Sequence, residues 1–406
     1  MTKPHILVIG AGIAGLCTAY WLTQSGFQVT VWESEAYPAQ KTSRANGSQL
    51  SACNAQVWHT WPQIKKAFKW MWDAQAPFHV SAHWDTLKWR WLMQFALEAA
   101  RGNQTQHTQN TIRMAMESAQ ALEQMVTQEQ IEFDHVKKGI LHVYAHEQEF
   151  VQAQEYQELF AQAGCAWKPM DAEACVNLEP ALKNYQNLQG GIYTHHDSTG
   201  DMHMFCVNLS SRLQQKWGVQ FEFNKTARNI CADSQGVTVD KERFDGMVLA
   251  NGVWARDLAQ QVGEDLMIYP VKGYSITVQL DQASAQAAPW VSMLDEATKI
   301  VCSRLGEHRL RVAGTAELCG YNWDIQSHRV APLLNWVRSR FPDVNVSMYT
   351  PWAGLRPMTP DQMPIVRGTQ NHRVWLATGF GHLGWTLSPG VTRRLAQDMA
   401  HSWFIK

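Results

Sequence analysis

The first stretch of the chain, HILVIGAGIAG at residues 5–15, decides the fold. Its first five residues form a short, largely apolar run and predict a strand. Its three glycines predict a tight turn into a helix, because apolar residues recur at helical spacing beyond it. An alternating apolar run at residues 27–31 predicts a second strand, which closes on Glu33. The sequence therefore predicts a βαβ unit at the N-terminus.

The glycines and the acidic residue of this unit each have a physical task in holding a dinucleotide. Gly10 permits the tight turn, Gly12 lets the backbone approach a pyrophosphate, and Gly15 allows the helix to pack closely on the strand. Glu33 can accept hydrogen bonds from ribose hydroxyls and disfavours a ribose 2′-phosphate. A glycine pattern also occurs in ordinary turns, but here all the parts fall in register, which favours a dinucleotide site.

The loop that follows, TSRANGSQ at residues 42–49, helps to choose the dinucleotide. A nicotinamide-dependent dehydrogenase usually continues directly into further βα units, whereas this loop is small and polar throughout. Such a loop suits hydrogen bonding around a buried flavin.

Length and composition exclude several classes of protein. A chain of 406 residues exceeds the usual size of one core, so we expect two domains. Because 35 basic residues balance 36 acidic ones, we expect no nucleic-acid partner. The eight cysteines show no metal-ligand spacing, which predicts reduced thiols in the cytoplasm, with neither a disulfide framework nor a metal site. We also expect no secretory leader and no membrane span.

The C-terminal segment repeats the glycine pattern in a different setting. Residues 373–378 predict a strand, GFGHLG at 379–384 a turn, and residues 387–399 a helix. Only 22 residues follow Gly384, too few for a second strand and acidic partner, so we reject a second dinucleotide site. A helix N-terminus at residues 384–386 could instead face negative charge that develops on a reduced flavin.

The middle of the chain alternates helices and strands. Helices are expected at 62–130, 147–163 and 202–217, and strands at 139–144, 190–194, 219–223, 238–240, 244–250, 274–278, 299–303 and 310–313. The later strands predict the sheet of a second domain inserted between pieces of the first.

The motifs of the whole chain together resemble the D-amino-acid oxidase superfamily, and within it the D-amino-acid dehydrogenase small-subunit family. Besides residues 10–15 with Glu33, the resemblance lies in TSRAN at 42–46, FKWM at 68–71, TGD at 199–201, YPVKGYS at 269–275, GLRPMTPD at 354–361 and LGWT at 383–386. The related dehydrogenases commonly read Thr-Gly-His-Gly before the last motif, whereas here Phe380 takes the histidine's place and His382 follows two positions later.

The resemblance implies an α/β fold: an FAD-binding, Rossmann-like domain of the glutathione-reductase type, and an interleaved α+β substrate domain with a mixed or antiparallel sheet. We expect the FAD-binding domain over residues 1–60, 200–265 and 345–406, and the substrate domain over 61–199 and 266–344. FAD would be held noncovalently. The residues that the resemblance places along it are Gly10, Gly12, Ala14, Gly15, Glu33, Ser43, Arg44, Asn46, Gln49, Ala227, Gly252, Gly381, Gly384, Trp385 and Thr386.

Four residues are candidates for binding the substrate. By resemblance Arg356 would hold a carboxylate, since a guanidinium fork fits it in two parallel hydrogen bonds; the alternative is a structural salt bridge, for instance to Asp361. Lys299 falls where one relative places a carboxylate-binding tyrosine. Tyr274 could donate to the carboxylate or pack within the sheet, and His382 could line the site or serve as a structural residue. Arg44 could face either substrate or solvent.

The function implied by the resemblance is FAD-dependent oxidation of a D-amino acid to a 2-oxo acid and ammonia. We expect electrons to pass to a quinone or another respiratory acceptor. The alternatives are an oxygen-using oxidase of glycine, sarcosine or proline type, a nicotinamide-dependent dehydrogenase, and a non-catalytic FAD-binding subunit. The Trp- and Lys-rich segment 65–91 suits peripheral association with the inner face of the cell membrane or, alternatively, the packed lid of a substrate domain.

Overall fold

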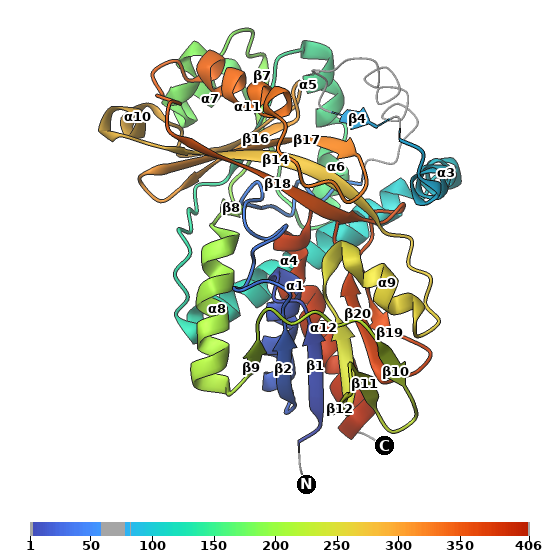
Figure 1. Ribbon diagram of the computed structural model, residues 1–406. Coiled ribbons are helices and arrows are strands. Elements are labelled where there is room, and N and C mark those ends of the chain that lie inside the picture. The colour runs from blue at the N-terminus through green and yellow to red at the C-terminus, as the bar shows by residue number, and fades with distance from the viewer. Residues whose placement is uncertain (1–2, 58–77, 82, 405–406) are drawn as a thin grey trace.

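The protein consists of two sheets lying one across the other, with helices on their outer faces (Figure 1). A computed structural model describes residues 3–57, 78–81 and 83–404. Within these ranges the strands form a six-stranded sheet, here the parallel sheet, and a nine-stranded sheet, here the mixed sheet. Two small sheets, β10–β12 and β3 with β8, complete the strands described. The predicted α/β class with a second, mainly antiparallel sheet is confirmed.

The parallel sheet contains the βαβ unit predicted at the N-terminus. Its strands, in spatial order, are β19 (Ile365–Gly368), β20 (Val374–Thr378), β13 (Gly246–Leu249), β1 (His5–Ile9), β2 (Gln28–Trp32) and β9 (Gln220–Glu222). The strand β19 is antiparallel to β20, and the other neighbours are parallel. Thus the C-terminal strand of the chain lies two places from the N-terminal one.

Both faces of the parallel sheet are covered, which explains why residues 6–9 of its central strand are all apolar. Ile6 and Val8 of β1 pack under α1 and the other long helices, whereas Leu7 and Ile9 pack on the opposite side. The helices of the first face are α1 (Ile13–Gln24), α4 (Gln104–Glu129), α8 (Met202–Trp217) and α12 (Gly384–Phe404). The second face carries β10 (Ile230–Ala232), β11 (Val237–Val239), β12 (Glu242–Phe244), η2 (Gly252–Trp254) and α9 (Ala255–Gln260).

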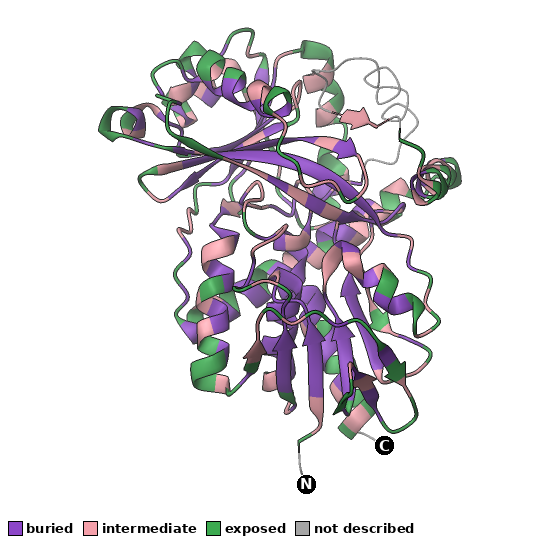
Figure 2. Cartoon of the chain, viewed as in Figure 1, coloured by how far each residue is buried: buried purple, intermediate pink, exposed green. Residues whose placement is uncertain are grey.

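The mixed sheet has one face in a core and one face turned toward the parallel sheet (Figure 2). Its strands, in spatial order, are β18 (Tyr349–Met358), β14 (Tyr269–Gln279), β17 (Arg309–Leu318), β16 (Ile300–Leu305), β15 (Ser292–Asp295), β5 (Ile140–Tyr144), β7 (Gly190–Thr194) and β6 (Lys168–Asp171), and β4 (Phe78–Val80) pairs with β17. The other elements are α3 (Thr86–Arg101), α5 (Glu147–Gln154), α6 (Gln157–Gln162), α7 (Ala172–Leu178), η1 (Pro180–Asn184), α10 (Gln282–Ala287), α11 (Ser327–Arg340), β3 (Gln49–Leu50) and β8 (Ser198–Thr199).

Two segments pack with a different domain from the one to which the sequence assigned them. The predicted FAD-binding segment 345–406 begins with β18, which pairs with β14 in the mixed sheet. The helix α4, expected in the substrate domain, buries Ile112, Ala115 and Met125 in the same core as α1 and α12. Both differences arise because each segment's partner is distant in sequence.

Local predictions differ from the structure at two places. The helix expected over 147–163 is divided into α5 and α6. Within 62–130, the strand β4 pairs with β17, while residues 58–77, including the FKWM motif and the first part of the Trp- and Lys-rich segment 65–91, lie outside the described residues.

The expectation that all cysteines are reduced thiols is wrong. Cys53 and Cys165 form a disulfide with their Cα atoms 6.2 Å apart, although 112 positions separate them in the sequence. The fold brings these two residues together, so the spacing of the cysteines could not reveal the pair. The remaining cysteines are free.

No helix within the described ranges is both long enough and apolar enough to cross a bilayer.

Candidate active site

A cavity of about 1770 Å³ lies between the two sheets and takes its walls from both. Pockets for single small ligands usually measure ~300–1,000 Å³. The volume therefore accommodates a dinucleotide together with a small substrate.

The glycine turn at one end of the cavity is built as the sequence predicts. Gly10 has a φ of +102°, and a Cβ at this position would come within 2.9 Å of the backbone oxygen of Ala250. A Cβ on Gly15 would lie 1.8 Å from the backbone oxygen of Gly10. Only glycine at both positions lets α1 pack this closely on the sheet, and Gly12 at its N-terminus lines the cavity.

Glu33 ties the second strand to this turn. Its carboxylate accepts hydrogen bonds from the amide of Ala11 (2.7 Å), the hydroxyl of Ser34 (3.0 Å) and the amide of Glu35 (3.0 Å). The residue is buried but contacts the cavity. An acceptor fixed here fits the ribose of a dinucleotide whose pyrophosphate lies at the N-terminus of α1.

A second helix N-terminus meets the cavity beside the glycine turn, since a Cβ on Gly384 would lie 3.9 Å from Ile13 at the start of α1. The helix α12 begins at Gly384, and Gly384, Trp385 and Thr386 all line the cavity. The first amides of a helix have no partner within it and form its positive end. This arrangement suits negative charge on a ligand, as the sequence predicts.

The polar loop 42–49 crosses five strands of the mixed sheet in succession. At one end the Thr42 hydroxyl donates to the backbone oxygen of Leu355 in β18 (2.8 Å), and at the other Gln49 Nε2 donates to Ser292 Oγ in β15 (3.0 Å). Between them the backbone oxygens of Ala45, Asn46 and Gly47 accept from Ser275, Arg311 and Ser303. The loop thereby joins the two sheets, and Ser43, Asn46 and Gln49 line the cavity.

Arg356 lies on the cavity without an acidic partner. Its Nη1 donates to the backbone oxygen of Thr315 (3.1 Å), and no carboxylate of the described residues neutralises the guanidinium. The alternative salt bridge to Asp361 is not formed, since Asp361 accepts from the amide of Met363. Burial lowers the pKa of Arg356 to about 10, so the group remains charged at neutral pH.

His382 lies near Arg356 on the same cavity. Burial and, to a smaller extent, the charge of Arg356 lower the pKa of His382 to about 4, although a hydrogen bond with the backbone of Asn54 acts in the opposite direction. The imidazole is therefore neutral at physiological pH. An unperturbed histidine titrates near neutral pH, whereas this environment favours the neutral form of His382 there.

Tyr274 contributes to the cavity wall, but its side chain is buried. Residues of β14 alternate between the cavity and the core under α11, and Tyr274 packs in that core with Ile276. Its hydroxyl donates to Glu317 (3.1 Å). The alternative of packing within the sheet is the one that the structure supports.

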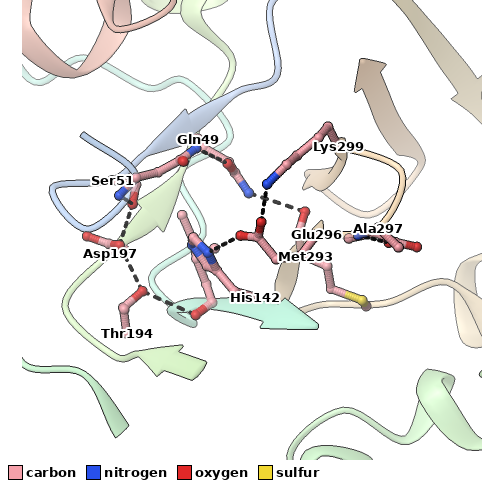
Figure 3. A network of polar contacts seen from close by, with 12 residues as sticks. Gln49, Ser51, His142, Thr194, Asp197, Met293, Glu296, Ala297 and Lys299 are labelled. Carbon is pink, nitrogen blue, oxygen red and sulfur yellow. Dashed lines mark hydrogen bonds and ion pairs between the residues drawn. The ribbon is translucent and has the colours of Figure 1, made fainter. Parts of the chain in front are cut away.

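Lys299 lies on the cavity but away from Arg356. It precedes β16, three strands from β18, which at ordinary strand spacing is roughly 14 Å. Lys299 forms an ion pair with Glu296, which also accepts from His142 Nδ1 (3.0 Å), and Figure 3 shows this network beside Gln49. Burial raises the pKa of Glu296, but Lys299 and His142 together lower it by more, to about 2. Lys299 is thus already paired with a carboxylate of the protein, whereas Arg356 is not paired with any carboxylate of the described residues.

Most of the predicted site residues are brought to the one cavity. Gly15 and Arg44 are not in its wall: Gly15 packs against Gly10, and Arg44 is exposed and donates to Gln40. The cavity residues that the sequence did not single out include His142, Glu296 and the apolar residues of α3. Of these, only α3 could have been recognised from the sequence, by its tryptophans. His142 and Glu296 are distant from each other in the sequence, and no pattern connects them.

Comparisons with known proteins agree with this architecture. The family described as "FAD dependent oxidoreductase" (DAO) matches residues 5–398. D-amino acid dehydrogenase 3 of Mesorhizobium japonicum is 43% identical over 98% of the chain and 97% of its own length, and D-amino acid dehydrogenase of Paramagnetospirillum magneticum is 38% identical over 96% and 94%. Glycine oxidase from Geobacillus kaustophilus shares the fold with a TM-score of 0.74 at 19% identity, covering 98% of this chain and 95% of that one.

Proposed function

Since the chain belongs to the DAO family of FAD-dependent oxidoreductases, we propose that it oxidises a D-amino acid at the α-carbon, yielding a 2-oxo acid and ammonia. Its cofactor is FAD. The observation that carries the proposal is the unpaired guanidinium of Arg356 on the cavity wall. A cation removed from water without a counter-charge is costly, and a carboxylate ligand would supply that charge.

The residues of the cavity fit FAD. Gly12 leaves space where a pyrophosphate would approach the N-terminus of α1, and Glu33 offers an acceptor for the ribose. The first turn of α12 would face the flavin end, where its amides stabilise negative charge. Cys53, the one described cysteine in the cavity wall, is held in the disulfide with Cys165 and offers no free thiol, so we propose that FAD is held noncovalently.

The protein's own contribution to the reaction is orientation. FAD, when bound, supplies the acceptor for a hydride from the α-carbon. Arg356 would hold the carboxylate in two hydrogen bonds, which fixes the α-carbon and excludes amines that lack an acid group. His382, being neutral, adds no second positive charge beside Arg356. Water then hydrolyses the resulting imine, releasing ammonia.

Reduction of the flavin without oxygen tests this function. The purified protein should be yellow and should bleach on anaerobic addition of D-alanine or D-leucine, but not of the L-enantiomers. Bleaching by NADH alone would support a nicotinamide-linked enzyme, and a protein that stays yellow with every amino acid would support a non-catalytic FAD subunit. Reduction by glycine, sarcosine or proline in preference to D-amino acids would point to the oxidase alternative.

For the electron acceptor we propose a quinone or another respiratory carrier at the membrane surface. The exposed side of α3 supports this: Trp89 is 47%, Met93 60% and Leu97 49% exposed, at positions that fall on one helix face. Arg90 beside them is also exposed. Washed cell membranes should retain the protein and accept its electrons. Recovery only in the soluble fraction, together with rapid peroxide production, would show that oxygen is the acceptor instead.

A further inference from the structure

One wall of the cavity next to Arg356 is apolar. Val271 is the cross-strand partner of Arg356, and Met358 lies two residues beyond it on the same side of β18. Both residues line the cavity and belong to one hydrophobic cluster. A ligand whose carboxylate lies on Arg356 therefore has apolar surface directly beside it.

The helix α3 and the strand β4 extend this wall into an arm of the cavity. Trp91 is 3% exposed, and its Nε1 donates to the backbone oxygen of Met358 (2.9 Å). The ring of Phe95 stacks on Trp91 with centroids 5.1 Å apart. Phe78 of β4 lies opposite Ala316 of β17. We call the wall formed by Phe78, Trp91, Phe95, Val271, Ala316 and Met358 the apolar arm.

A network of charged side chains in the cavity lies away from the apolar arm. The His142–Glu296–Lys299 network belongs to β5, β15 and the turn before β16, and thus to strands three to five places from β18. A polar or charged substrate side chain in the apolar arm would lose its hydration without gaining a partner from the six residues that form it. An aliphatic or aromatic side chain would instead remove apolar surface from water.

We propose that the apolar arm receives the substrate's side chain and makes large aliphatic and aromatic D-amino acids the preferred substrates. The inference rests on the proposed function and narrows it. D-Leucine, D-methionine and D-phenylalanine should have higher kcat/KM values than D-alanine by roughly tenfold or more, since a single methylene in an apolar pocket is worth about 10- to 200-fold. D-Aspartate and D-glutamate should be poor substrates.

A pair of alanines on α3 offers a matched test. Ala96 lines the cavity, and Ala100, one turn further along the helix, is exposed. Ala96→Phe would fill the arm and should lower the kcat/KM ratio of D-phenylalanine to D-alanine by roughly 10-fold or more. Ala100→Phe should leave that ratio unchanged. If Ala96→Phe lowers kcat/KM for both substrates in equal proportion, or if the wild type prefers D-alanine, the inference is wrong while the proposed function stands.

A binding measurement on the wild-type holoenzyme needs no variant. Straight-chain carboxylates from acetate to hexanoate should perturb the flavin spectrum with Kd values that fall by roughly fourfold per methylene, the equivalent of about 0.8 kcal/mol. Affinities independent of chain length would show that the apolar arm does not receive the substrate's side chain. If neither D-amino acids nor carboxylates affect the flavin, the proposed function fails as well, which separates the two outcomes.

Discussion

The guanidinium of Arg356 lies directly over the backbone of Gly273, on the neighbouring strand β14. A Cβ on Gly273 would come within 2.2 Å of both Nη1 and Nη2. Glycine at this position therefore gives the arginine the space in which it lies against the sheet and still contacts the cavity. The carboxylate site that we propose depends on these two residues together.

Gly273→Ala should displace the guanidinium without preventing FAD binding. A charge-assisted hydrogen bond contributes about 1.5–3 kcal/mol, so kcat/KM should fall by roughly 10- to 150-fold. Gly354 is the cross-strand partner of Gly273, and a Cβ there would lie 3.4 Å from Thr42, an ordinary contact. Gly354→Ala is thus the matched control, and its kcat/KM should fall only slightly. Equal kinetics for the two variants would mean that the position of Arg356 does not matter.

The N-terminal unit could be predicted because its determinants are local. Alternating apolar residues, the glycines and Glu33 lie within one short stretch, and each acts on neighbours along the chain. Tyr274 could not be placed in the same way. The sequence of β14 shows that Gly273 and Tyr274 point to opposite faces, but only the packing of α11 decides which face is the core.

The sequence also could not show that Arg356 has no acidic partner among the described residues. Asp361 was a plausible partner by spacing, but its carboxylate accepts from Met363 in a turn of its own. The disulfide shows the same limit, because Cys53 and Cys165 meet only through the packing of the whole chain. The sequence could thus identify side chains suited to a site. It could not show which neighbouring groups form hydrogen bonds or ion pairs with them and which do not.

Gly12→Val should abolish FAD binding while leaving the chain folded. A Cβ at Gly12 meets nothing nearer than Ser43 Oγ at 3.2 Å, so the backbone can keep its course, but the added carbons occupy the path of the pyrophosphate. The purified variant should be colourless and unfold at the temperature of the wild-type apoprotein. Gly15→Ala should differ, because its Cβ meets the Gly10 backbone and should lower that temperature. Wild-type flavin content in Gly12→Val would contradict the assigned site.

Removal of the disulfide should destabilise the protein. Cys53 and Cys165 close a loop of more than a hundred residues, and disulfides typically contribute about 2–4 kcal/mol to the free energy of unfolding. Cys165→Ser should show this loss, and dithiothreitol should produce it in the wild type but not in the variant. Thiol titration of the denatured, unreduced chain gives an independent check. Eight reactive thiols rather than six would show that the bond is absent.

His382 should make stability depend on pH in the acidic range. Its pKa is lowered from 6.5 to about 4 in the folded protein, chiefly by burial. Between these values the unfolded chain binds the proton more readily, so the native state loses stability as the pH falls from about 6.5 to 4. His382→Gln should reduce that loss, measured as the difference in melting temperature from the wild type at pH 4.5 and pH 7.5. The same difference at both pH values would mean that His382 titrates normally.

The most direct test of the account compares an amino acid with its decarboxylated amine. In anaerobic stopped-flow experiments the wild type should reduce its flavin far faster with D-leucine than with 3-methylbutylamine. Because truncating one member of a buried charge pair costs about 2–5 kcal/mol, Arg356→Ala should lower kcat/KM for D-leucine by roughly 30-fold to several thousandfold, retain FAD and lose most of the preference for the acid. Arg356→Lys, which keeps the charge but not the fork, should fall between. An Arg356→Ala variant that reduces its flavin at a near-normal rate and still prefers the acid would show that Arg356 does not bind the substrate carboxylate.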